Sequence, residues 1–311
     1  ITTLLPDKNN PIIDLVTGDT AADLAWIWYL FHAKFDKVSP IISQRLQQEL
    51  RAKVLDPFYQ RNDYWWITGW GEGRTNNWTP WCSYNVLTCV LLLETDPQKR
   101  EDGIYKTMGA VDHFINSYPE DGGCSEGPGY WGAASGRLFD YLTLLQKASQ
   151  GKIDIFSNEL IQNMGRYIYR VYVSKGEYYV NFADAQAKLH HNGGLIYRYG
   201  KAIQDPAMQQ FGAYLLSKSN GVERMTSGRL GSNLETLFSP EDWQSVPKTE
   251  PLLKQYYLPN LDVAIARDKE GTDQGFYFAA KGGHNNEQHN HNDVGSFILS
   301  YNGNPVLLDV G

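Results

Sequence analysis

The spacing of apolar residues changes once along the chain, and this change limits the fold more than any other feature. From residue 19 to about residue 216, apolar side chains recur every three or four residues, which is typical of amphipathic helices. Leu24, Ile27 and Phe31 show this spacing. No strand pattern separates most of these segments, so they predict an all-helical domain of stacked helical hairpins. The expected helices lie at 20–35, 40–59, 81–95, 98–117, 132–149, 157–174, 185–203 and 206–218.

The C-terminal part of the chain follows a different pattern. Residues 219–251 are rich in polar residues, glycine, serine and proline, and indicate a linker or long loops. Asn302-Gly303 is the dipeptide most typical of a tight hairpin, so we predict an antiparallel sheet here. Its expected strands are the alternating or β-branched runs at 261–267, 275–281, 295–301 and 305–310.

Together these patterns predict an α+β protein with a helical domain at 1–245 and the start of a β domain at 246–311. A length of 311 residues is ample for two hydrophobic cores. A sheet of about four strands with an open edge is a poor end for a domain. We therefore expect this stretch to be the first part of a larger β domain.

Composition and charge exclude several classes of protein. With 42% hydrophobic and 20% charged residues, the chain is typical of a globular protein and not of a disordered one. Its net charge of −7 and pI near 5.5 disfavour nucleic acid and anionic lipid as partners. The longest nearly apolar run, 86–93, is far shorter than the roughly 20 residues that span a bilayer. The N-terminus lacks the order of a signal peptide, so we expect a soluble chain whose export signal was removed or never existed.

Aromatic residues make up 13% of the chain, and many lie among Gly, Asn and Thr rather than in helical stripes. Sugar rings pack their C–H faces on such aromatic planes while neighbouring polar groups bind the hydroxyls. The alternative is an aromatic-rich core in which each Trp N–H has a partner in the protein. The residues concerned are Tyr64, Trp65, Trp66, Trp70, Trp78, Trp81, Tyr130 and Trp131.

The densest polar segment spans residues 282–293 and holds three of the seven histidines. His289 and His291 are two residues apart, so on an extended segment their side chains point the same way and can meet at one metal ion. Asp309, across the predicted hairpin, could reach the same spot. The two interpretations of this segment are a zinc site and a solvated polar loop.

Two further segments bring polar residues to predicted helix starts. The first spans 74–81, and the second, 121–132, is a glycine-rich turn that delivers Tyr130 to the next helix. Neither contains a GxGxxG or P-loop pattern, so these glycines do not indicate a phosphate site. Taken singly, each segment is also explained by helix capping and turn formation.

In order along the chain, these segments match a family. The sequences NNW (76–78), DGG and EGPGYWG (121–132), NFAD (181–184) and HNHND followed by FILSYNGNPVLLDVG (289–311) resemble the heparinase II/III-like polysaccharide lyases. More distantly, they resemble alginate lyases of the same architecture. The resemblance covers about residues 70–311 and implies an incomplete (α/α) toroid followed by an antiparallel β-sandwich. It also implies a bacterial enzyme that is periplasmic or secreted.

The resemblance implies β-elimination in a polysaccharide that contains uronic acid. The proton at C5 is removed, the 4-linked oxygen leaves, and hydrogen-bond donors must stabilise the charge that develops on the carboxylate. By resemblance, Asn77 contacts that carboxylate, Tyr130 is the base or acid, and His289 faces Tyr130 from the β domain. His291 and Asp309 match zinc ligands of the family, with a third ligand expected past residue 311 and a structural role for the metal.

The chain also departs from the family. Many relatives have His after the matched Asn, where Trp78 stands here, so one neutralising group is either missing or supplied by Asn76 or His284. Pro80 stands where heparinase II-like enzymes have Glu. The nearest acid is Glu126, for which a structural role is favoured over a chemical one. The expected substrate contacts are Arg74, Asn76, Trp78, Trp81, Glu126, Trp131 and His284.

Charge bears on the substrate as well. No basic run accompanies these segments, so a uronan with little or no sulfate is expected, although Arg74, Arg137, Lys188 and Arg198 could form a local patch. Two other functions stay open at this point. One is a non-catalytic glycan-binding protein that keeps the aromatic cleft. The other is a glycoside hydrolase on a similar helical scaffold, which needs two carboxylates about 5–10 Å apart.

Overall fold

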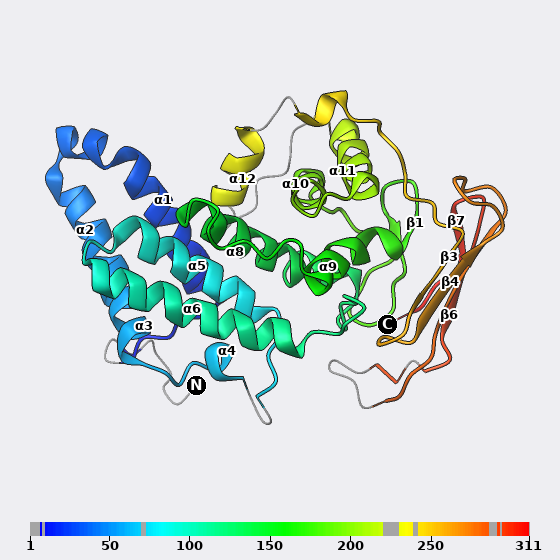
Figure 1. Ribbon diagram of the computed structural model, residues 1–311, viewed down its shortest axis with the longest axis horizontal. Helices are drawn as coiled ribbons and strands as arrows, with labels where there is room; N and C mark the ends of the chain where they lie inside the picture. The colour runs from blue at the N-terminus through cyan, green and yellow to red at the C-terminus, as the bar shows by residue number, and fades with distance from the viewer. Residues whose placement is uncertain are drawn as a thin grey trace. The chain divides into compact units, whose positions relative to one another are not determined.

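The structure is a computed structural model that describes residues 7, 10–69, 73–219, 230–238, 242–285, 291–292 and 294–310. It contains both helices and sheets, as predicted (Figure 1). The chain forms two compact units. The first unit comprises residues 1–117, 137–153 and 225–234, and the second unit comprises 118–136, 154–224 and 235–311. The predicted domain boundary at 245/246 stays a prediction.

The first unit is helical. Asp14 begins α1, because its carboxylate accepts a hydrogen bond from Thr17 N (2.7 Å). Helix α5 is apolar on nearly all sides and buried through most of its length, so it forms the centre against which α1 and α6 pack. The helices are α1 (Leu15–Val38), α2 (Pro40–Leu50), a π-helix (Arg51–Leu55), α3 (Asp56–Gln60), α4 (Trp65–Thr68), α5 (Trp78–Leu93), α6 (Pro97–Ser117) and most of α8 (Ser135–Ala148) and α12 (Leu230–Leu237).

The second unit contains the remaining helices and both sheets. Helices α10 and α11 pack closely because Gly212 brings their backbones together: a Cβ atom there would lie 2.4 Å from Tyr197 N. The elements before the large sheet are α7 (Pro128–Trp131), α9 (Glu159–Arg170), β1 (Tyr172–Ser174), β2 (Tyr178–Tyr179), α10 (Gly193–Ala202), α11 (Pro206–Lys218) and a 3-10 helix (Asp242–Ser245).

The large sheet is an antiparallel meander in which each strand pairs with the next. Its strands are β3 (Gln255–Leu258), β4 (Val263–Arg267), β5 (Phe276–Lys281), β6 (Phe297–Tyr301) and β7 (Asn304–Leu307). Tyr301 pairs with Asn304, and the two residues between them have φ values of +49° and +71°. The hairpin predicted at Asn302-Gly303 is therefore confirmed.

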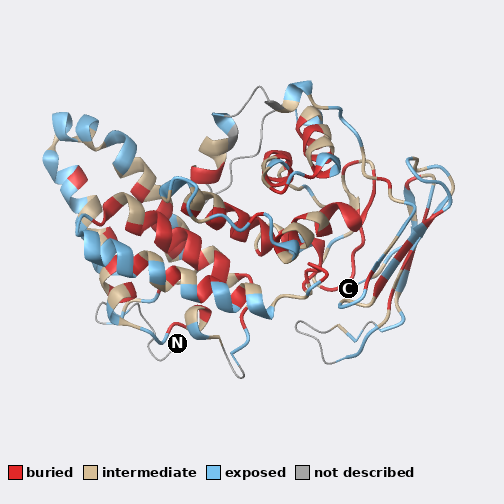
Figure 2. Ribbon diagram, in the orientation of Figure 1, coloured by how far each residue is buried: buried red, intermediate tan, exposed pale blue. Residues whose placement is uncertain are grey.

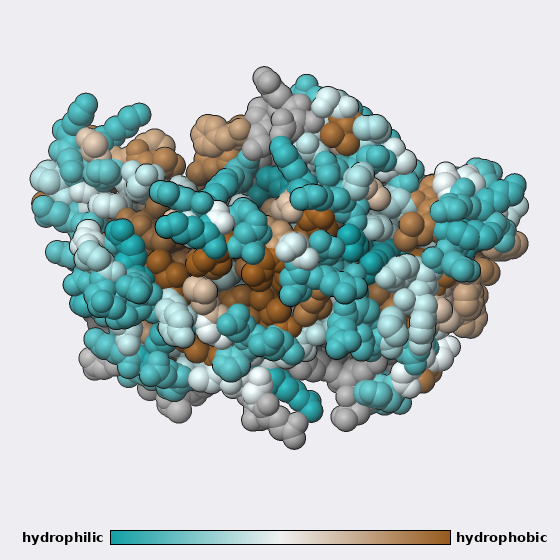
Figure 3. Space-filling model, in the orientation of Figure 1, coloured by the Kyte–Doolittle hydropathy of each residue, from teal (hydrophilic) through white to brown (hydrophobic). Residues whose placement is uncertain are grey.

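The two faces of this sheet differ in burial (Figure 2). One face is buried and carries Val263, Ile265, Arg267, Tyr277, Ala279, Lys281, Ile298 and Ser300. The other face is apolar yet exposed, with aromatic pairs between neighbouring strands at Phe276–Tyr301 (4.9 Å between ring centroids) and Phe278–Phe297 (5.8 Å). Figure 3 shows apolar residues at the surface of these strands.

Several elements differ from their predictions. The helix expected at 157–174 ends at Arg170, because the chain turns back through Lys175 and Gly176, both with positive φ, to form the β1–β2 pair. The helix expected at 185–203 begins only at Gly193, since Leu189 N bonds Glu177 O and Lys188 bridges to Tyr178. Strand β3 was not predicted, because it lies between the stretch interpreted as loops, 219–251, and the first expected strand at 261–267. Among the described residues, no helix is both long and apolar enough to cross a bilayer.

Candidate functional site

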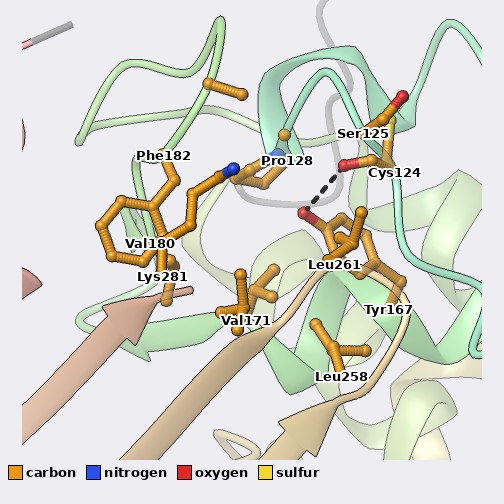
Figure 4. A pocket seen from close by; sticks show the side chains of 13 residues that line it. Cys124, Ser125, Pro128, Tyr167, Val171, Val180, Phe182, Leu258, Leu261 and Lys281 are labelled. Atoms are coloured by element: carbon orange, nitrogen blue, oxygen red, sulfur yellow. Dashed lines mark hydrogen bonds between the residues drawn. The ribbon is translucent and has the colours of Figure 1, made fainter. Parts of the chain in front are cut away.

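Two of the segments singled out in the sequence meet within the second unit, around one cavity that the end of strand β5 also lines (Figure 4). The 121–132 turn, the 181–184 segment and the end of β5, which leads into the 282–293 loop, all contribute to its walls. The cavity has a volume of about 20 Å³, room for one or two water molecules. It is lined by Cys124, Ser125, Gly127, Pro128, Tyr167, Val171, Val180, Phe182, Ala183, Leu258, Leu261, Val263 and Lys281.

The conformation of Gly127 allows the 121–132 turn to fold onto the 181–184 segment. Gly127 has φ +82°, and a Cβ atom there would lie 2.6 Å from Phe182 O. Its carbonyl accepts a hydrogen bond from Tyr130 N (3.2 Å), which starts the short helix α7. Tyr130, which follows this turn, is itself 39% exposed. The predicted catalytic tyrosine therefore stands on the surface beside the cavity.

Asp121 fixes the turn to the loop between β3 and β4. Its Oδ2 accepts a hydrogen bond from Asn260 N (2.8 Å), and its own N donates to Asn260 Oδ1 (3.1 Å). Its Oδ1 also accepts a hydrogen bond from Gly123 N (2.8 Å). This reciprocal pairing holds the backbone before Tyr130 at the sheet, and Asp121 is an anchor that sequence reasoning did not single out.

Trp131 and Glu126, both predicted as substrate contacts, lie inside the turn. Trp131 is fully buried, its indole N–H donates to Met164 O (2.8 Å), and its ring stacks on Tyr199. No face of this ring is left for a sugar, so Trp131 is a core residue. Glu126 is only 5% exposed, and burial together with its charge raises the pKa of the Cys124 thiol to about 12. Glu126 thus belongs to the interior of the turn, and Cys124 stays protonated at neutral pH.

Lys281 is the cationic residue of the cavity wall. It is 6% exposed and is the last residue of β5, where Tyr277, Ala279 and Lys281 alternate onto the buried face. Figure 4 shows its side chain running past Phe182 toward Pro128. Sequence reasoning missed Lys281. The available signal was the alternation along β5, which places this lysine where an apolar residue is expected.

His291 pairs with a carboxylate that was not predicted to be its partner. Its Nε2 lies 2.6 Å from Asp184 Oδ1, and both side chains are about three-quarters buried. Asp184 ends the 181–184 segment, and a Cβ atom at Gly129 would lie 3.4 Å from its carbonyl oxygen. The His291–Asp184 pair therefore lies close to the turn that carries Tyr130.

Asp309 is held nearby by the same segment. Asn181 Nδ2 donates to Asp309 O (2.8 Å), and Ser296 Oγ donates to the Asp309 carboxylate. The described residues contain no group of three His, Cys, Asp or Glu side chains that could hold a metal ion. His291 and Asp184 nevertheless fit part of a zinc site, because a histidine whose Nε2–H is held by a carboxylate presents Nδ1 to a metal.

The predicted residues at 74–81 belong to the first unit. Asn76 Oδ1 accepts a hydrogen bond from Trp78 N (2.9 Å), the first residue of α5, whose N-cap is Asn77. Asn77 is 5% exposed at the start of that helix. Trp78 is half-buried, with its ring 4.9 Å from the ring of Trp65, and Arg74 is exposed. This segment shows the capping and packing that its sequence also allowed.

Trp81 joins a buried polar cluster in the same unit. Its Nε1–H donates to Asp19 Oδ1 (2.6 Å), which also accepts from Asn85 Nδ2 (2.9 Å) and Arg137 Nη2 (3.2 Å). The Arg137 guanidinium lies over the Trp81 ring at 4.9 Å and is fully buried, so Arg137 does not form the surface basic patch suggested by the sequence.

The remaining predicted residues lie in or beside the 282–293 loop. His284 is exposed, and His289 falls outside the described residues. The expected convergence of Asn77, Tyr130 and His289 stays a prediction. Comparison with known proteins adds no relative, because neither a family model nor a curated protein matches the chain.

Proposed function

We propose that this chain belongs to a polysaccharide lyase that cleaves a uronic-acid-containing polysaccharide by β-elimination. The observation that carries the proposal is the meeting of the 121–132 turn and the 181–184 segment around one cavity, with His291 of the 282–293 loop hydrogen-bonded to Asp184. These segments are far apart in the sequence, and each carries part of the resemblance to the heparinase II/III-like enzymes. Tyr130, two residues after Pro128 of the cavity wall, is exposed.

In the proposed reaction, Tyr130 takes the C5 proton of the uronate or gives a proton to the departing 4-oxygen. A phenol with a pKa near 10 needs cationic groups or close donors to act as a base at neutral pH. Asn77 donates from its amide to the sugar carboxylate, which accumulates negative charge as the proton leaves. His289 faces the same sugar from the β domain.

The proposed architecture is an incomplete (α/α) toroid at 1–245 followed by an antiparallel β-sandwich that begins at 246. Neighbouring helices that pack in pairs, as α5 with α6 and α10 with α11 do, support the first part. The antiparallel sheet has one buried face and one exposed aromatic face. The exposed face supports the β-sandwich, because a second sheet would cover it.

Zinc is proposed as a structural metal of the β domain. His291 and Asp309 would hold it, with a third ligand further along the chain, and Asp184 would orient His291. When bound, the ion would hold the loop that carries His289 against the sheet. We also propose a periplasmic or secreted location in a bacterium and a substrate with little or no sulfate.

The deciding experiment compares the wild type with Tyr130→Phe on alginate, polygalacturonate, heparosan, hyaluronan and heparin. Ultraviolet absorbance of the unsaturated product measures elimination. We expect cleavage of an unsulfated uronan, and a loss of about 10²- to 10⁴-fold in kcat for Tyr130→Phe, in the range of general acid–base catalysis. Tyr105→Phe, on the exposed surface of α6, is the matched control and should retain full activity.

Two results would contradict the proposal. Binding of a uronan without any unsaturated product would favour a non-catalytic glycan-binding protein. Near-normal turnover by Tyr130→Phe would remove Tyr130 from the mechanism. Fastest cleavage of heparin would refute only the expected low sulfate content of the substrate.

A further inference from the structure

Asp262, in the loop between β3 and β4, holds the start of the 282–293 loop through two hydrogen bonds. Its backbone O accepts a hydrogen bond from Gly282 N (2.7 Å), and its carboxylate Oδ2 accepts one from Gly283 N (2.8 Å). Gly282 lies directly against this carboxylate, because a Cβ atom there would lie 2.8 Å from Asp262 Oδ2. Asp262 therefore fixes the backbone immediately before His284, which is exposed.

The backbone conformation on both sides of this contact is unusual. Asp262 has φ +52°, in the left-handed region that aspartate and asparagine adopt more readily than most residues with side chains. Gly283 has φ +85°, which favours glycine. Residues held in such sparsely populated conformations cluster at functional sites. The observation therefore points to a role for Asp262 beyond closing a turn.

The same β3–β4 loop is also paired with the turn that leads to Tyr130. Asn260, two residues before Asp262, forms the reciprocal hydrogen bonds with Asp121 described above. One short loop therefore holds the backbone before Tyr130 on one side and the start of the 282–293 loop on the other. These two segments are the ones that carry candidate site residues.

The far end of the 282–293 loop is held independently. His291 Nε2 lies 2.6 Å from Asp184 Oδ1, and Lys281 O accepts a hydrogen bond from Gly295 N (2.8 Å). Loss of the Asp262 carboxylate should therefore leave this end attached and displace only the first residues of the loop.

We propose that Asp262 is a positioning residue of the lyase site, which acts through Gly283 to set the place of His284. The inference rests on the proposed function, within which His284 contacts the uronate, and Asp262 itself touches no substrate. A displacement of about 1 Å in a group that contacts the substrate costs up to about 100-fold in rate. Removal of the Asp262 carboxylate should therefore affect turnover more than folding.

The test compares Asp262→Gly and Asp262→Asn with the wild type in the full chain, on the unsulfated uronan that is cleaved fastest. Asp262→Gly tolerates the positive φ but has no carboxylate, so it should lower kcat about tenfold or more with KM within about threefold. Asp262→Asn keeps an oxygen acceptor for Gly283 N and should restore kcat to within about threefold of the wild type. Thermal unfolding of each variant is measured in parallel.

Asp268→Gly is the matched control. Asp268 Oδ2 accepts a hydrogen bond from Phe276 N (2.7 Å) just after the opposite end of β4, so this variant loses the same kind of bond and the same charge. It should retain the wild-type kcat. Gly282→Ala is a second perturbation, because its Cβ atom displaces the carboxylate of an unchanged Asp262 and should also lower kcat. It replaces Asp262→Gly in the comparison if that variant does not fold.

A double variant tests whether Asp262 acts through His284. The effects of two residues that act as a unit are not additive. Asp262→Gly should therefore lower kcat by less than about threefold when His284 is already alanine. Unchanged kcat in the Asp262→Gly and Gly282→Ala variants, an equal loss in Asp268→Gly, no rescue by Asp262→Asn, or additive losses in the double variant would overturn the proposal.

These outcomes are distinguishable from a failure of the lyase proposal. Release of unsaturated product that Asp262→Gly does not change would support the lyase and overturn the positioning role. Calorimetry with heparosan and alginate tetrasaccharides covers the other case. Binding without any unsaturated product, weakened about tenfold by Asp262→Gly and His284→Ala alike and restored by Asp262→Asn, would support the positioning role and overturn the lyase. Neither cleavage nor binding of any probe would overturn both.

Discussion

Replacing Asp19 by alanine should destabilise the first unit by about 3 kcal/mol. Asp19 Oδ1 accepts hydrogen bonds from Trp81 Nε1, Asn85 Nδ2 and Arg137 Nη2, which links α1 to both α5 and α8. The Asp19 side chain is 14% exposed and that of Arg137 is 0% exposed. The substitution therefore removes a carboxylate that pairs with a fully buried guanidinium.

The magnitude follows from the burial of this pair. Removing one partner of a buried ion pair costs about 3–5 kcal/mol, because the other charge loses its compensation. Partial exposure of Asp19 places the expected value at the lower end of that range. Asp19→Asn keeps an oxygen acceptor but loses the charge, so it should cost about 1–2 kcal/mol, the difference between charged and neutral hydrogen bonds.

Native-state hydrogen exchange of the α5 amides measures the free energy of opening in this unit directly. Glu49→Ala is the control, since Glu49 pairs with Arg45 (2.6 Å) and Lys53 (3.0 Å) on an exposed helix surface. Exposed pairs of this kind contribute about 0–1 kcal/mol. A cost below about 1 kcal/mol for Asp19→Ala, or an equal cost for the control, would refute the reasoning.

Three further predictions concern the second unit and its candidate site. Gly212→Ala should lower stability by about 1–3 kcal/mol, because its Cβ would lie 2.4 Å from Tyr197 N. The control Gly109→Ala on α6, which has open space around it, should raise stability by up to about 1 kcal/mol. Equal shifts in the thermal unfolding temperature of the two variants would contradict this prediction. Burial, together with the charge of the neighbouring His190, lowers the pKa of His191 to about 3 from an ordinary value of 6.5. Only the unfolded state then gains this proton as the pH falls below 6.5, so stability is full above that pH and is progressively lost toward pH 3, by about 2 kcal/mol at pH 5. Denaturation at pH 7.5 and 5 should show a smaller loss in His191→Phe, and equal losses would count against the assignment. We expect bound zinc that His291→Ala abolishes and that Asp184→Asn weakens about 10- to 100-fold. Metal analysis and chelator competition measure this, and a metal-free protein would contradict it.

Local sequence patterns were sufficient for most helices and for the β6–β7 hairpin. Helical spacing and N-caps such as Asp205, whose carboxylate accepts a hydrogen bond from Met208 N, act between residues three or four positions apart. The Asn302-Gly303 turn is likewise local, because positive φ at both residues is a property of the dipeptide. The β1–β2 pair was missed, since residues 157–174 carry a helical spacing that the chain's turn after Arg170 overrides.

The partners of the candidate site residues could not be predicted in the same way. His291 was expected to lie near Asp309 across a hairpin, and the hydrogen bond that it makes with Asp184, 107 positions away, was not predicted. Trp131 and Trp81 both lie beside other aromatic residues in the sequence. Trp131 donates to Met164 O in the core of the second unit, whereas Trp81 donates to Asp19 in the first. Composition alone does not distinguish such rings from ligand-binding ones.

The sequence by itself determined most helices, four strands of the large sheet, the hairpin, and which segments hold polar residues suited to chemistry. Spacing and turn preferences act between near neighbours, so they survive without knowledge of the rest of the chain. Only the tertiary structure decided that Trp131 is buried, that Tyr130 is exposed, and that Lys281 faces the cavity under the 121–132 turn. Burial and pairing depend on which distant segment packs against a residue, and that is fixed only when the whole unit folds.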